Sequence, residues 1–146
     1  MISEFPSLKD GEFETVSART SQYNCIAWAA DDNERWWEPD PIGIMYWPPG
    51  APREWTLDGL MAAFETLGYE KCDSGDLEPG FEKVAFYAFM TGEPTHVAWQ
   101  RPDGRWTSKL GDYEDIIHDS LDGLTGSQYG LVMGFMKRRR QKRAND

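Results

Sequence analysis

The sequence contains few of the cysteine and histidine side chains that thiol chemistry uses as nucleophile and base. There are two cysteines, Cys25 and Cys72, and two histidines, His96 and His118. A thiol attacks a carbonyl when its thiolate is stabilised and a base lies within hydrogen-bond reach. We predict that Cys25 is the nucleophile and that His96 is its general base.

Cys25 lies in a run of small and apolar residues, 21–30, that is typical of a buried helix. Ser21 or Asn24 can cap the first turn of this helix. Cys25 then lies in the first turn or just before it, where free N–H groups and the helix dipole favour a thiolate. The alternative is that Cys25 is a small buried hydrophobic residue, as free cysteines often are. Cys72 lacks comparable support, and we interpret it as structural.

His96 opens the predicted strand His96-Val97-Ala98-Trp99, whose rigid backbone could present an imidazole to the thiol. The alternative is a histidine whose nitrogens are satisfied at the end of a strand. His118 follows Asp115-Ile116-Ile117 and is a supporting residue or a second candidate base.

The remaining pattern predicts which elements hold these residues. Apolar residues at three- and four-residue spacing from Leu57 to Leu67, followed by Gly68, predict an amphipathic core helix. The segment 112–124 allows a short helix or an irregular arm. Because helices precede an antiparallel sheet, we predict an α+β domain. Strands are expected at 83–89, 96–100, 105–110 and 129–136, with a hairpin turn at Pro102-Asp103-Gly104.

A long aromatic loop is predicted between the two helices, because its prolines rule out regular helix and central strand. Long structured loops in compact domains are often functional. The indoles of this loop could line a substrate groove, but packing over the core explains them equally well. The candidates are Trp36, Trp37 and Trp47, together with Trp28 from the preceding helix.

Length and charge limit the classes of function. A chain of 146 residues with 14% aromatic residues fits a single folded domain. The net charge of -10 argues against nucleic acid or an anionic membrane as a partner of the body. No apolar stretch approaches the length of a membrane span, and Met1 to Pro6 lack the features of a signal peptide. We therefore predict a cytoplasmic protein with reduced thiols.

The domain is expected to span residues 1–137 and to end in a basic tail, 138–146. Such a tail is usually solvated and disordered, although it could contact an acidic partner or the acidic body of its own chain. Neither cysteine has a nearby Cys or His at metal-ligand spacing, so we expect no metal and no cofactor.

The order of motifs resembles papain-like cysteine hydrolases of the NlpC and CHAP amidase type. The resemblance rests on Leu77-Glu78-Pro79-Gly80, the strand from Val84, His96-Val97, a turn with Gly104, and Trp106-Thr107-Ser108. It implies a papain-like arrangement, with a helix headed by the cysteine and a sheet that carries the histidine. Ser108 stands where that family places the residue that orients the base, and this is a departure because a hydroxyl orients an imidazole more weakly.

Other residues acquire candidate roles around this pair. Asp112 or Asp115 could supply the missing carboxylate if the chain curls back. The backbone N–H of Cys25, with Gln22 or Asn24, could form an oxyanion hole. Lys109 could contact substrate, although charged residues near a sheet edge are more often only solvated.

A wider pattern resembles an uncharacterised family of small bacterial proteins. It comprises Asn24-Cys25-Ile26-Ala27-Trp28-Ala29, Trp106-Thr107-Ser108-Lys109-Leu110-Gly111, Asp115-Ile116-x-His118 and Tyr129-Gly130. This second resemblance implies no particular chemistry.

Two functions follow from these observations. The first is a thiol hydrolase or acyl transferase, in which Cys25 attacks the carbonyl of a peptide-like amide, isoamide or thioester after His96 takes its proton. The alternative is a binding module, such as an immunity, inhibitor or adaptor protein, that uses its acidic surface and aromatic loop against a basic partner protein.

Overall fold

The computed structural model describes residues 13–17, 23–110, 115–126 and 128–143. Within these residues, no helix is both long and apolar enough to cross a membrane. The elements in chain order are β1 (Phe13–Ser17), α1 (Cys25–Ala29), α2 (Leu57–Glu65), β2 (Glu70–Cys72), β3 (Phe81–Ala88), β4 (Pro94–Gln100), β5 (Trp106–Lys109), β6 (Asp115–His118), the 3-10 helix η2 (Leu121–Leu124) and β7 (Leu131–Arg139).

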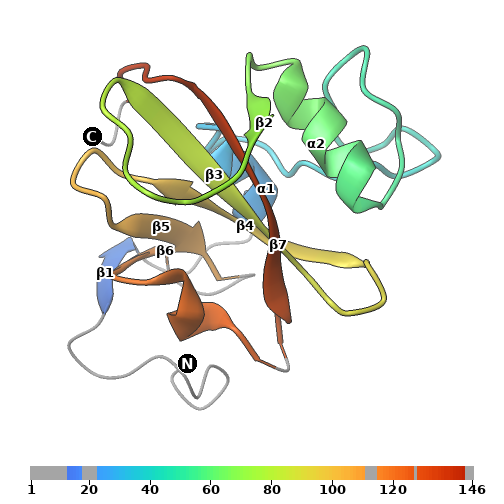
Figure 1. Cartoon of the computed structure of the whole chain (residues 1–146). Coiled ribbons are helices and arrows are strands. Elements are labelled where there is room, and N and C mark those ends of the chain that lie inside the picture. Colours follow the sequence, from blue (N-terminus) through green and yellow to red (C-terminus); the bar gives the residue numbers. More distant parts are fainter. Residues whose placement is uncertain (1–12, 18–22, 111–114, 127, 144–146) are drawn as a thin grey trace.

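A single sheet forms the centre of the molecule (Figure 1). In the part of the chain that the structure describes, it has seven strands in the order β1-β6-β5-β4-β3-β7-β2. Every neighbouring pair of strands is antiparallel. The predicted hairpin between β4 and β5 is confirmed, and its turn closes through the bond from Gly104 N to Arg101 O at 3.0 Å.

The two faces of the sheet carry separate cores. Both α-helices pack on one face, which we call the helix face, where Ile26 and Phe64 meet Val84, Val97 and Trp99. The opposite face, which we call the η2 face, has its own core of Ala85, Tyr87, Ala98, Trp106, Leu110, Ile116 and Leu124. Because successive side chains of a strand point to opposite faces, β3 and β4 contribute alternate residues to the two cores.

The predicted fold class, an α+β domain with N-terminal helices on the sheet in a papain-like arrangement, is wrong. The sheet dominates the described residues, and α1 has five residues. The helix stops there because Ala30 leaves helical geometry and Asp31 adopts a left-handed φ of 68°. The helix predicted from Leu57 is confirmed as α2, and Gly68 beyond it has a φ of 95°.

The boundary predicted between the domain and a basic tail falls inside a strand. β7 continues to Arg139, and residues 140–143 pack back against the body, where Arg143 is buried. Gln141 and Lys142 are exposed, whereas Arg143 pairs with Glu82, which fits the alternative that the tail contacts the acidic body of its own chain. Residues 144–146 lie outside the described residues.

Candidate functional site

Cys25 is the first residue of α1, as predicted. The helix begins there because the Asn24 side chain accepts a hydrogen bond from Ala27 N at 3.1 Å. This bond satisfies a free N–H group of the first turn.

The environment of Cys25 does not favour a thiolate. Burial raises the pKa of the thiol to about 11, against smaller lowering effects from the backbone of Val97 and Ile26 and from the charge of Lys109. A reactive cysteine needs the opposite balance, in which the surroundings favour the anion over the neutral thiol. The thiol is therefore protonated at neutral pH.

His96 lies on the η2 face, away from Cys25. It is opposite Tyr87 in the β3–β4 register, and its ring stacks on Tyr129 with centroids 4.3 Å apart. The next residue, Val97, belongs to the core of the helix face, where Cys25 also packs. The sheet therefore separates the imidazole from the thiol, and the structure does not bring the predicted pair together.

The His96 imidazole is buried without a polar partner among the described residues. Burial and, to a smaller extent, the nearby His118 hold its pKa well below the usual value. A buried neutral histidine on this face cannot accept a proton from Cys25 directly.

Ser108 contacts His118 instead of His96. Its Oγ lies 2.8 Å from His118 Nε2, and His118 Nδ1 lies 2.9 Å from the Ser120 carbonyl oxygen. Because that carbonyl only accepts, Nδ1 carries the proton and Nε2 accepts from the Ser108 hydroxyl. Burial lowers the pKa of His118 to about 4. Ser108 and His118 thus form a buried polar pair on the η2 face, and Ser108 does not orient the predicted base.

Lys109 and Asp115 face each other across β5 and β6 and are both buried. The Tyr23 hydroxyl donates to an Asp115 carboxylate oxygen, and the Lys109 ammonium lies 5.7 Å from the centroid of the Tyr23 ring. These residues form a buried polar layer beneath α1. Lys109, predicted as a substrate contact with a solvated edge charge as the alternative, is thus part of the interior.

The remaining residues predicted around the thiol have structural positions. The Trp28 indole is buried and donates to Thr107 Oγ1 at 3.0 Å. The Asn24 amide donates to the Trp37 carbonyl oxygen at 2.6 Å, and Asn24 Oδ1 accepts from Trp37 N at 3.1 Å. Asn24 therefore ties the start of α1 to the aromatic loop. Gln22 and Asp112 lie outside the described residues.

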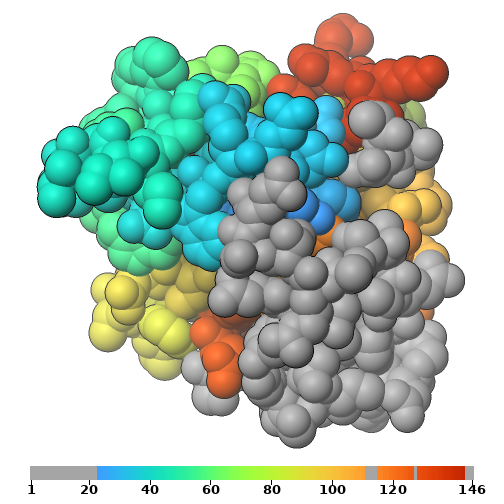
Figure 2. Space-filling view, turned by 180° about the vertical axis from the view of Figure 1, so that it is seen from behind, coloured from blue at the N-terminus to red at the C-terminus, as the bar shows by residue number. Residues whose placement is uncertain are grey.

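The Trp loop, residues 30–56, connects α1 to α2 and forms part of the surface seen in cyan and teal in Figure 2. Trp37 and Trp47 are buried in the core, and each also lines one of the two pockets of the loop, so both explanations weighed for them fit. Trp36 lines an open pocket of about 500 Å³ together with Ile44 and Tyr46.

A second pocket of about 490 Å³ adjoins the first one and has an acidic lining. Asp31 and Asp32 belong to the second pocket, whereas Glu34, Arg35 and Tyr46 line both. The Arg35 guanidinium lies 3.7 Å from the centroid of the Tyr46 ring and is paired with Asp32 at 2.9 Å. One loop therefore offers two adjoining pockets: the first, which we call the apolar pocket, is lined mainly by apolar and aromatic side chains but also by Glu34, Arg35 and Arg53, and the second is acidic.

The most exposed large apolar side chains of the Trp loop were not predicted as site residues. Ile42 is 81% exposed, Ile44 is 76% exposed and Trp55 is 44% exposed. The available signal was the run Pro41-Ile42-Gly43-Ile44, in which apolar residues stand within a proline-rich loop.

A family model for a domain of unknown function, DUF7689, matches residues 14–137. The chain belongs to the DUF7689 family. No curated protein and no solved structure matches it. The match is to neither NlpC, CHAP nor another papain-like family, so the resemblance to cysteine hydrolases is overturned.

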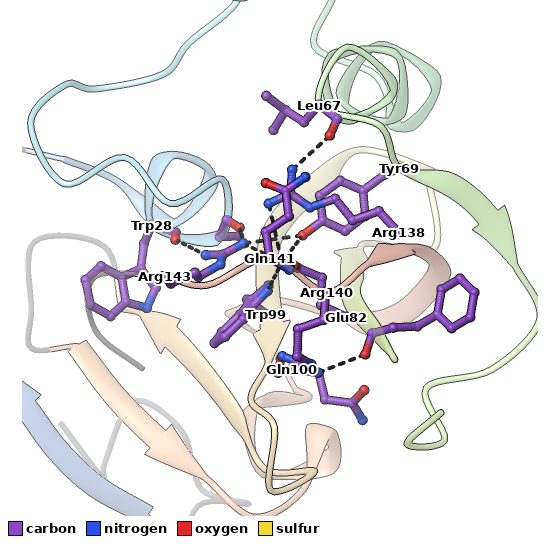
Figure 3. Close-up of polar contacts among 12 residues, drawn as sticks. Trp28, Leu67, Tyr69, Glu82, Trp99, Gln100, Arg138, Arg140, Gln141 and Arg143 are labelled. Atoms are coloured by element: carbon purple, nitrogen blue, oxygen red, sulfur yellow. Dashed lines mark hydrogen bonds and ion pairs between the residues drawn. The ribbon is translucent and has the colours of Figure 1, made fainter. Parts of the chain in front are cut away.

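A second group of buried polar residues in this DUF7689 protein surrounds Glu82 (Figure 3). The Glu82 carboxylate accepts from Trp99 Nε1 at 2.7 Å, Tyr69 Oη at 3.0 Å and Gln141 N at 2.6 Å. Arg138 and Arg143 complete the cluster, at 3.4 Å and 3.2 Å from Glu82 Oε1. Three of these partners lie beyond residue 137, where the family match ends.

Proposed function

We propose that this DUF7689 protein is a binding module that docks a basic segment of a partner protein on the Trp loop. The observation that carries the proposal is the pair of adjoining pockets, one apolar and one acidic, on a loop that is braced against the core. This arrangement fits a segment with an apolar side chain next to a lysine or arginine.

Exposed apolar side chains are present on the Trp loop, and one of them, Ile44, lines the first pocket. Ile42 and Ile44 project from the loop with 81% and 76% of their surface exposed. Protein interfaces gain most of their affinity from a few apolar or aromatic anchors that become fully desolvated. Ile44 and Trp36 both line the apolar pocket, so a partner side chain seated there would cover them together.

The Trp loop is held in shape by its own hydrogen bonds. The Asp40 carboxylate accepts from Ile44 N at 2.8 Å and Met45 N at 3.0 Å, and Arg53 donates to the same carboxylate at 3.0 Å. The Trp47 indole donates to the Pro52 carbonyl oxygen at 2.9 Å. A loop that is ordered before binding loses little conformational entropy on binding, which favours affinity.

Charge supports a basic partner. The Trp loop has six carboxylates and two arginines, and both arginines are engaged in ion pairs with aspartates of the loop. The whole chain has a net charge of -10. Complementary charge speeds association and disfavours acidic competitors.

The thiol chemistry anticipated from Cys25 is less well supported than docking. His96 lies on the other face of the sheet, and burial raises the pKa of Cys25 to about 11. A working thiol nucleophile requires a base within reach and a stabilised thiolate. Both cysteines are free, which supports the cytoplasmic location that we propose for the protein, since reducing compartments keep thiols unpaired.

A peptide selection tests the docking proposal. A displayed library of random peptides would be selected on the full chain, and the enriched peptides would then be tested for binding to the Ile44→Ser variant. We expect enriched peptides that pair an aliphatic or aromatic residue with lysine or arginine. Glu34→Lys should weaken their binding, whereas Met90→Ser should not, because Met90 is 92% exposed on the turn between β3 and β4. Peptides that bind the Ile44→Ser variant equally well, or that lack basic residues, would overturn the proposal.

A further inference from the structure

The segment Arg140–Arg143, which we call the C-terminal strap, leads from the end of β7 to α1. Its last residue, Arg143, is only 5% exposed. The Arg143 guanidinium donates to the carbonyl oxygens of Trp28 at 3.3 Å and Ala29 at 2.7 Å. These carbonyls belong to the last turn of α1, so a side chain from the strap caps the C-terminal end of that helix.

The strap is fixed by a second set of contacts. The guanidinium of Arg143 lies 3.9 Å from the centroid of the Trp99 ring and 3.2 Å from Glu82 Oε1. The Gln141 backbone N–H donates to the other oxygen of Glu82 at 2.6 Å. Figure 3 shows Arg143 between Trp28, Trp99 and Glu82, where it bridges α1 and the sheet. The site fits a planar cation with several donors, and lysine could not reproduce it.

The short helix α1 is also the platform of the Trp loop. At the start of α1, the Asn24 side chain forms hydrogen bonds with the backbone N–H and the carbonyl oxygen of Trp37. At its end, Asp32 N donates to the Ala27 carbonyl oxygen at 2.8 Å. The Asp32 carboxylate in turn accepts from the Trp37 indole at 2.9 Å. The contacts that shape the inner part of the Trp loop therefore run through α1.

A helix of five residues gains little stability from its own hydrogen bonds and depends on its surroundings. Arg143 contributes contacts at the end of α1 that leads directly into the Trp loop. Release of the strap would leave the carbonyls of Trp28 and Ala29 without this donor, although the β3–β4 pairing of the central sheet would keep its backbone hydrogen bonds.

We propose that the C-terminal strap is a clamp that regulates the docking surface: with Arg143 seated, α1 and the Trp loop are ordered for binding, and with the strap released they are not. This inference rests on the proposed docking function. The strap lies beyond the residues matched by the family model, 14–137.

Amide hydrogen exchange on the full chain tests the clamp. Arg143→Ala should speed exchange in residues 25–37 by about tenfold or more beyond any increase in β3 and β4, because loss of the ion pair with Glu82 affects the whole domain whereas loss of the cap opens α1 locally. The matched control is Lys142→Ala, a change at the neighbouring, exposed position of the strap, which should leave both regions as they are. Arg143→Lys should give an intermediate increase and provides a milder variant if Arg143→Ala does not fold.

Two outcomes would overturn the clamp. One is equally faster exchange in β3, β4 and α1, which would show that the strap only stabilises the whole domain. The other is unchanged exchange in residues 25–37.

Peptides from the library selection separate this inference from the docking function. If Ile44→Ser abolishes peptide binding and Arg143→Ala leaves it intact despite faster exchange, regulation by the strap is wrong and docking stands. If no peptide requires Ile44 for binding but Arg143→Ala speeds exchange in residues 25–37, the docking function is wrong. The strap would then only order α1 and the Trp loop.

Discussion

Glu82 on β3 and His96 on β4 lie on neighbouring strands but on opposite faces of the sheet. Both side chains are fully buried. Burial raises the pKa of Glu82. The Gln141 N–H, the Trp99 indole and two arginine charges together lower this pKa by more than burial raises it, so the net pKa is below its usual value. His96 has no such partner among the described residues, and burial keeps it neutral.

This difference shows two ways of burying an ionisable group. Glu82 remains charged because donors and cations replace the water that it has lost, whereas His96 gives up its charge. The first arrangement ties the C-terminal strap to the body. The second makes the fold sensitive to acid. Cys25 resembles His96 in that its side chain is kept neutral, because burial is the largest effect on its pKa as well.

The comparison predicts the largest effect at Glu82. Glu82→Gln removes the negative charge and leaves Arg138 and Arg143 buried without their counter-charge. Removing one partner of a buried ion pair costs roughly 3–5 kcal/mol. We expect the free energy of unfolding in urea to fall by about this amount. The measurement is a urea titration followed by tryptophan fluorescence.

Glu78→Gln is the matched control for this prediction. Glu78 pairs with Lys137 at 3.0 Å and with Lys83 at 3.6 Å, but its side chain is 37% exposed. Exposed pairs contribute about 1 kcal/mol or less. Equal losses from the two substitutions would mean that the cluster around Glu82 does not behave as a buried charge network.

Local signals in the sequence predicted several elements correctly. The Asn24 side chain marks the start of α1, apolar spacing from Leu57 marks α2, and Pro102-Asp103-Gly104 marks a turn. Each of these signals acts within a few residues. The sequence therefore indicated the position of Cys25 at a helix start.

The face of the sheet on which His96 lies could not be predicted in the same way. A shift of one residue in register moves a side chain to the other face. The β3–β4 pairing is irregular beside His96, since Tyr87 pairs with His96 and Ala88 pairs with Pro94. The Glu82 cluster was missed for a related reason. Glu82 and Arg143 are 61 residues apart, and a basic run near a chain end usually indicates a solvated tail.

The histidines should give the next largest effect, through pH. The folded pKa of His96 is well below 6.5 and that of His118 is about 4, so the unfolded chain binds protons first as the pH falls. Each histidine therefore lowers stability below pH 6.5 and has no effect above it. The expected slope is about 1.4 kcal/mol per pH unit for each histidine.

His96→Phe tests this pH effect, because phenylalanine can keep the stacking on Tyr129. The slope of unfolding free energy between about pH 6.5 and 5 should fall by roughly half relative to the parent chain. The contribution of Glu82 is lost only as the pH falls below its usual value of 4.5, outside this window. If His96→Phe left this slope unchanged, His96 would be protonated in the folded protein. His96 would then be a charged buried group like Glu82, and the two sites would not differ.

Asn24→Ala should have a smaller effect that is concentrated in the Trp loop. The substitution removes the cap of α1 and both hydrogen bonds to Trp37. Loss of a cap costs about 1 kcal/mol, and loss of the tether adds a similar amount. Urea unfolding should show a loss of about 2 kcal/mol. Asn33→Ala, at an exposed position of the same loop, is the control, and equal losses from both changes would contradict the tether.

Cys25→Ser should change stability least, by about 1 kcal/mol or less, because it replaces a small side chain at the edge of the core. The thiol itself gives a sharper measurement. With its pKa raised from 9.0 to about 11, Cys25 should react with iodoacetamide at pH 8 on the order of 100-fold more slowly than in the unfolded chain. Mass spectrometry separates Cys25 from Cys72. Rapid alkylation of Cys25 below pH 8 would show that its surroundings stabilise the thiolate, as the partners of Glu82 stabilise its carboxylate. Cys25 would then again be a candidate nucleophile.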